Sequence, residues 1–151
     1  MAKGTTDSAK PRELSTMGIL EGAAMGAAVG ALLNVVVFAV AGAAGVSRVA
    51  EFEQGEPPSE LTVVQVMVSS FMPAIAAALG TLVLNQITAR PGRIVIGVAT
   101  VLALLSTGAP LALGGASVGL RGVLAVMHLV SAATIVGGML RSGRQRPPSY
   151  T

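Results

Sequence analysis

The sequence has no cysteine and no tryptophan, and it holds one histidine and one tyrosine in 151 residues. Without cysteine the chain cannot be a disulfide scaffold, and a lone histidine does not make a zinc site. Only 11% of the residues are charged, against about 25% in a soluble domain, whereas 52% are hydrophobic. This composition excludes a disordered chain and an ordinary water-soluble domain. We expect no metal and no other cofactor.

The few charged residues leave four long stretches without any charge. Each stretch is close to the roughly 20 residues that cross about 30 Å of hydrocarbon as a helix. We therefore predict four transmembrane helices, at about 17–46, 61–87, 94–113 and 118–140. A soluble bundle would need polar outer faces, which these segments lack, and the first segment is too long for the core of a signal peptide. The predicted fold is all-α, a transmembrane four-helix bundle.

Basic residues are concentrated on one side of the predicted spans. Eight of the ten lie in the tail 1–16, in the connection after the second span and in the basic tail 141–151, whereas the loop 47–60 is acidic. Because Lys and Arg mark the cytoplasmic face, we expect both termini inside, the acidic loop outside and up-down-up-down topology. These residues flank the spans, so we expect the lipid bilayer as partner and no nucleic acid.

The first span carries glycines at every fourth position, Gly18, Gly22, Gly26 and Gly30. Small residues at this spacing let two helix backbones approach closely in lipid. One interpretation is a face for a homo-oligomer or for a membrane-protein partner. The other, which the sequence favours, is packing against the second or fourth span of the same chain.

Polar side chains at mid-span depth form a candidate site. Its members are Asn34, His128, Ser131, Ser106 and Thr107. An ionisable group at this depth is a site hypothesis, either in a proton relay or as a contact to a buried substrate. The interpretation we favour is structural, with a neutral His128 bonded to Asn34, Ser106 or Thr107.

Charged residues near the span ends are expected to form interfacial ion pairs. Arg121 lies in the first turn of its span, where the helix dipole disfavours a cation, so we predict that a loop glutamate folds over to meet it. The candidates are Glu51, Glu53, Glu56 and Glu60. At the inner side, Glu21 lies within reach of Arg90, Arg93 and Arg141.

Pro73 lies in the middle of the second span and is predicted to kink it, because proline removes one backbone hydrogen bond. No span carries paired acids at matching depth, a nucleophile with its base, or a phosphate loop, so we expect no enzyme. We expect a protein that acts by helix–helix association, as an accessory, assembly or self-associating unit. The alternative is a small transporter or channel lined by Asn34, His128, Ser131 and the Pro73 kink.

Three short features carry a resemblance to a known family. They are Asn34 within a small-residue first span, the Leu105-Ser106 to Pro110 exit of the third, and Met127-His128-Leu129-Val130 in the fourth. In these features the chain resembles a family of small bacterial four-span membrane proteins catalogued as a domain of unknown function, over roughly 17–140. The resemblance implies a bacterial cytoplasmic membrane and adds no catalytic role.

Overall fold

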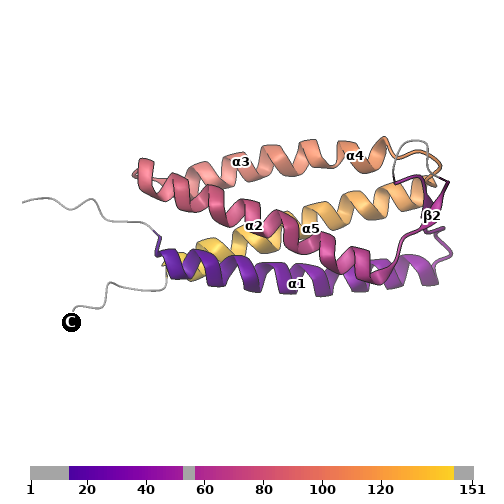
Figure 1. Cartoon of the computed structure of the whole chain (residues 1–151), viewed down its shortest axis with the longest axis horizontal. Helices are drawn as coiled ribbons and strands as arrows, with labels where there is room; N and C mark the ends of the chain where they lie inside the picture. The colour runs from indigo at the N-terminus through magenta and orange to yellow at the C-terminus, as the bar shows by residue number, and fades with distance from the viewer. Residues whose placement is uncertain (1–13, 53–56, 145–151) are drawn as a thin grey trace, which may run out of the picture.

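The computed structural model describes residues 14–52 and 57–144, which form four long apolar helical stretches packed side by side (Figure 1). The helices are α1 (Thr16–Ala43), α2 (Val63–Ile87), α3 (Pro91–Ser106), α4 (Gly108–Leu111) and α5 (Val118–Arg144). Together, α3 and α4 form one stretch, Pro91–Leu111, and each of the four stretches is long and apolar enough to cross a membrane. The prediction of an all-α bundle with four spans is confirmed, and the protein is a multi-pass integral membrane protein.

The helix bounds differ from the predicted spans for local reasons. The first helix ends at Ala43, before the expected Val46, because Gly45 adopts a positive φ of 80° that stops the helix. The third helix begins at Pro91, which needs no backbone donor at that position. The last helix continues beyond Leu140 to Arg144, since long basic side chains at a span end can extend toward the interface.

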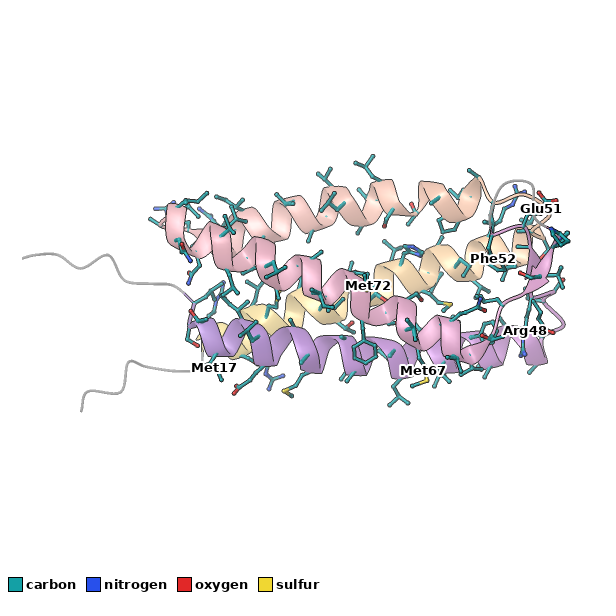
Figure 2. All side chains as sticks on the ribbon, viewed as in Figure 1. Met17, Arg48, Glu51, Phe52, Met67 and Met72 are labelled. Carbon is teal, nitrogen blue, oxygen red and sulfur yellow. The ribbon has the colours of Figure 1, made fainter. Side chains whose placement is uncertain are left out.

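Charged and apolar side chains separate along the bundle, as Figure 2 shows. Arg48 and Glu51 lie at one end, which we call the hairpin end, whereas Met67 and Met72 project from the flank and are exposed. At the opposite end, called here the terminal end, α1 begins and α5 ends (Figure 1). This distribution suits apolar flanks in lipid and charged ends at its two interfaces.

The glycine series of α1 packs against α5 of the same chain. A Cβ at Gly18, Gly22 or Gly26 would overlap a backbone carbonyl oxygen of α5, and one at Gly30 would lie 2.6 Å from Thr134 Oγ1. Ile19, Ala23, Ala27 and Ala31 on this side are also buried. The described glycine face is therefore occupied within the chain, as the favoured interpretation expected, and the partner is the fourth span.

At the hairpin end a short β-hairpin covers the bundle. Strands β1 (Val49–Ala50) and β2 (Ser59–Glu60) pair antiparallel, and the Glu51 amide donates to the Gly114 carbonyl at 3.0 Å. Ala50 is fully buried in an apolar cluster with residues such as Phe38 and Leu120. The acidic loop 47–60 was expected here without this pairing, because two-residue strands carry no periodicity to detect.

At the terminal end, the residues before α1 are bonded to two other helices. The Ser15 amide donates to the Gly143 carbonyl at 3.0 Å, and Asn85 Nδ2 donates to the Leu14 carbonyl at 2.9 Å. The Leu14 side chain is 1% exposed and contacts Gly143. These bonds fix the start of α1 against α2 and α5.

Pro73 lies inside α2 without ending it. Its ring nitrogen carries no hydrogen, so the Ser69 carbonyl lacks its usual helical donor. The predicted kink stays a prediction.

Candidate intramembrane binding site

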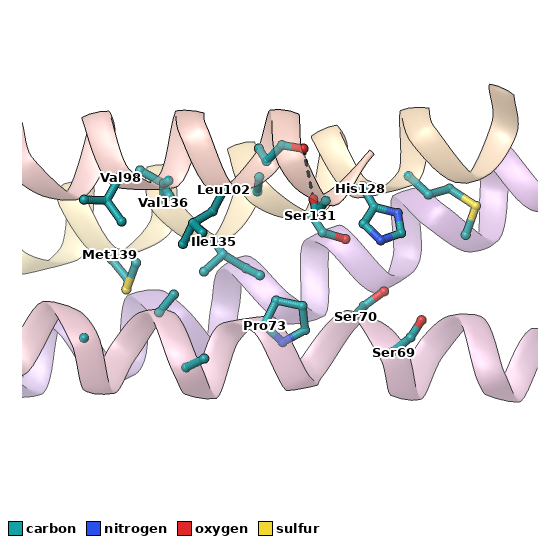
Figure 3. A pocket seen from close by; sticks show the side chains of 18 of the residues that line it. Ser69, Ser70, Pro73, Val98, Leu102, His128, Ser131, Ile135, Val136 and Met139 are labelled. Carbon is teal, nitrogen blue, oxygen red and sulfur yellow. Dashed lines mark hydrogen bonds between the residues drawn. The ribbon is translucent and has the colours of Figure 1, made fainter. Parts of the chain in front are cut away.

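A cavity of about 490 Å³ lies between α2, α3 and α5 (Figure 3). Most of its wall is aliphatic, with Val98 and Leu102 on α3 facing Ile135, Val136 and Met139 on α5. None of the charged side chains that the structure describes lines it. The volume lies within the roughly 300–1,000 Å³ typical of ligand pockets.

Small residues explain why this space stays open. Ala76, Ala77 and Gly80 line it from α2, and Ala99 and Ala103 line it from α3. A Cβ at Gly80 would meet no atom within 4 Å. The tight α1–α5 contact uses glycines to bring backbones together, whereas here small residues leave a gap between helices.

The polar wall of the cavity centres on Asn34 of α1. Asn34 Nδ2 donates to Ser131 Oγ at 2.8 Å and to Ser70 Oγ at 3.1 Å, which ties α1 to both α5 and α2. Ser70 Oγ donates its own hydrogen to the Val66 carbonyl at 2.9 Å, so toward Asn34 it can only accept. The end of the Asn34 amide that faces Ser70 is therefore the NH₂ group. The Asn34 side chain is 2% exposed, and its Oδ1 has no hydrogen-bond partner in the described chain.

His128 lines the same cavity, one helical turn before Ser131. In Figure 3 its imidazole points from α5 toward the α2 wall that carries Ser69 and Ser70. Its Nδ1 lies 2.8 Å from the Leu124 carbonyl of its own helix. The structure therefore gives His128 a backbone partner rather than Asn34, Ser106 or Thr107, and leaves the ring exposed to the cavity rather than enclosed.

The remaining two predicted site residues, Ser106 and Thr107, differ in their position relative to the cavity. Ser106 lines the cavity and donates to the Ala103 carbonyl at 2.9 Å. Thr107 follows the end of α3, donates to the Leu104 carbonyl at 2.6 Å and is not among the residues that line the cavity. Its place in the sequence, one residue after Ser106, puts it on a different side of the helix.

Ser69 and Ser70 are two residues of the site that were not predicted from the sequence. Both line the cavity beside Pro73. The available signal was two hydroxyls within an apolar span, one turn from a proline, at a depth comparable to that of Asn34.

The predicted ion pair of Arg121 involves four glutamates, of which the structure describes Glu51 and Glu60. Within 14–52 and 57–144, neither Glu51 nor Glu60 forms an ion pair with Arg121, whose Nε is buried without a partner. Glu53 and Glu56 lie outside the described residues. Glu51 does reach the start of the fourth span, but through its backbone bond to Gly114, with its carboxylate beside Gly114 and Gly115.

Two further features concern the charged residues. Glu21 is exposed near the terminal end of α1, just after the first turn of the helix. Arg48 places its guanidinium 4.4 Å from the centroid of the Phe38 ring, a cation–π contact that the sequence analysis missed. The described ranges contain no cluster of three or more His, Cys, Asp or Glu that could hold a metal.

Comparison with known proteins gives one match. A family model described as a family of unknown function, DUF6069, matches residues 15–145. No curated protein and no solved structure matches the chain. The matched range includes all four spans, the hairpin and the cavity, and the chain belongs to the DUF6069 family.

Proposed function

We propose that this integral membrane protein is a non-enzymatic binding protein, which holds an apolar molecule from the bilayer between α2, α3 and α5. The observation that supports this most directly is the cavity itself, aliphatic over most of its wall and polar at Asn34, Ser70 and Ser131. Ligand sites have this composition, with many apolar contacts for affinity and few polar groups for orientation.

The partial opening of the cavity also suits an occupant from the bilayer. Its apolar wall offers van der Waals contacts to an apolar molecule that enters between the helices.

The lining of the cavity also bears on the alternative of a transporter or channel, because it favours binding of a molecule over conduction through the bundle. A conducting path needs polar or charged groups along its length, and the described lining has polar groups mainly near Asn34 and His128. We also propose, from the charge distribution and the family resemblance, that the protein lies in a bacterial cytoplasmic membrane with both termini inside.

The test fills the cavity from its own wall. Gly80→Leu places a side chain in space that the structure leaves open, and the matched control is Gly137→Leu. Gly137 is also open, does not line the cavity and lies equally far from the terminal end of its helix. The measurement is mass spectrometry of apolar molecules that co-purify with each variant. We expect Gly80→Leu to lose them and Gly137→Leu to keep them; equal retention by both would refute the proposal.

Association between helices is a second candidate function. Because α5 covers the glycines of α1, we propose the outer face of α3 as the contact surface. The stretch Pro91–Leu111 has the smallest buried share of the four. A shallow groove on α3 is lined by Ile94, Gly97, Val98, Val101 and Leu102, and a Cβ at Gly97 meets nothing within 4 Å. A glycine open to lipid lets a helix of a second copy approach closely. Native mass measurement in mild detergent should show a dimer that Gly97→Leu converts to monomer.

A further inference from the structure

The hydroxyl protons around the cavity are largely used by the protein itself. Ser69 and Ser70 both donate to the Val66 carbonyl, at 3.0 and 2.9 Å. Thr81 donates to the Ala77 carbonyl at 2.7 Å, and Ser106 to Ala103. These side chains therefore satisfy carbonyls of their own helices and offer the cavity few donors.

Two groups remain as acceptors. Asn34 Oδ1 is buried and has no partner among the described residues, since the amide nitrogen makes both bonds to serines. His128 Nδ1 faces the Leu124 carbonyl, and because a carbonyl only accepts, this nitrogen must carry the hydrogen. In a neutral imidazole the other nitrogen, Nε2, is then an acceptor.

Only one of these acceptors is open to the cavity. Asn34 Oδ1 is a fully buried atom, whereas the exposed His128 ring lines the cavity one helical turn from Ser131. No described carboxylate, Lys or Arg lines this space to balance a charged ligand. The complement of such a wall is a neutral molecule that brings a donor.

We propose that the occupant is a neutral, largely apolar molecule with a hydroxyl group, which donates a hydrogen bond to His128 Nε2. This inference rests on the proposed function and adds the chemical class of the ligand. It distinguishes pairs of otherwise similar molecules, because an alcohol can donate and its ether isomer cannot.

The probes are 1-dodecanol and its isomer methyl undecyl ether, added to the full-length protein in detergent. Because the chain contains one histidine, ¹⁵N-histidine labelling of protein purified without a histidine tag gives signals from His128 alone. We expect the Nδ1–H tautomer, and a dodecanol-dependent shift of the Nε2 resonance that the ether does not produce. Competition measured by native mass spectrometry should favour the alcohol by about tenfold or more.

Variants separate the acceptor from the cavity. His128→Phe keeps an aromatic ring and removes the acceptor, so it should reduce the preference for the alcohol, whereas Gly137→Leu should preserve it. Equal binding of alcohol and ether by the unmodified protein would overturn this inference and leave the binding function in place. Failure of both probes to bind, with co-purifying molecules equal in Gly80→Leu and Gly137→Leu, would overturn the binding function itself.

Discussion

Gly22 and Gly138 meet backbone to backbone, so that a Cβ on either residue would overlap the carbonyl oxygen of the other. This contact joins the first span to the last. Its strength in lipid comes from close packing, because there is little hydrophobic drive between helices there. The glycine spacing therefore serves the fold of one chain.

Gly22→Ala is expected to lower the unfolding free energy by about 1–3 kcal/mol, since the added methyl must push α1 and α5 apart. Gly137→Ala is the matched control, because its Cβ would point into open space. The measurement is reversible unfolding in mixed detergent micelles. Equal stability of the two variants would contradict the close contact.

The α1 glycines also show how much of the helix packing can be predicted from the sequence. Their spacing predicted a close helix contact but allowed both the second and the fourth span as partner. Only the three-dimensional arrangement selects α5, because the choice depends on Gly138, Thr134 and Ser142 being opposite. The four spans were predictable because the bilayer fixes the length of a charge-free segment.

The candidate site was predicted less completely. Asn34 and Ser131 were named and are bonded, but Ser70 was missed, and Thr107 does not line the cavity. The rotational position of each helix decides which hydroxyl faces inward, and nearly uniform apolar spans carry little information about rotation. The orphan Oδ1 of Asn34 and the tautomer of His128 depend on hydrogen-bond directions that a sequence does not specify.

Asn34 and Ser131 are expected to be energetically coupled. In a double-mutant cycle with Asn34→Ala and Ser131→Ala, the coupling free energy should be about 0.6 kcal/mol, with about 1.7 kcal/mol as the upper range for such bonds in membranes. Unfolding in detergent supplies the four stabilities. Thr100, which bonds only its own helix, gives the control pair Asn34→Ala with Thr100→Ala, for which we expect no coupling. Strict additivity in the Asn34–Ser131 cycle would argue against the bond.

Arg121 is predicted to gain stability from a glutamate of the sequence between β1 and β2. Its Nε is buried without a partner in the described chain, and an ion pair near the interface is worth about 0.2–1 kcal/mol. Arg121→Glu should lower the melting temperature, and combining it with Glu53→Arg or Glu56→Arg should restore part of the loss. Unchanged thermal stability in every single and double swap would count against the pairing.

The charge distribution predicts sidedness, which the absence of native cysteine makes easy to test. Single variants Ser8→Cys, Ser59→Cys and Ser149→Cys are treated with a membrane-impermeant maleimide in intact cells. We expect labelling at Ser59→Cys alone, because both tails carry the excess of basic residues. Labelling of one tail and not the other would contradict an even number of spans; labelling of both tails without Ser59→Cys would invert the orientation.

The adjacency of α1 and α5 has a consequence for biosynthesis. The first span leaves the ribosome long before the helix that complements its narrow glycine face, so this interface cannot close until the last span has been synthesised and inserted. During that interval the glycine face of the nascent chain is in contact with the lipid or with the insertion machinery. A chain that terminates before α5 would keep this face exposed, so two truncated copies would be able to associate through it.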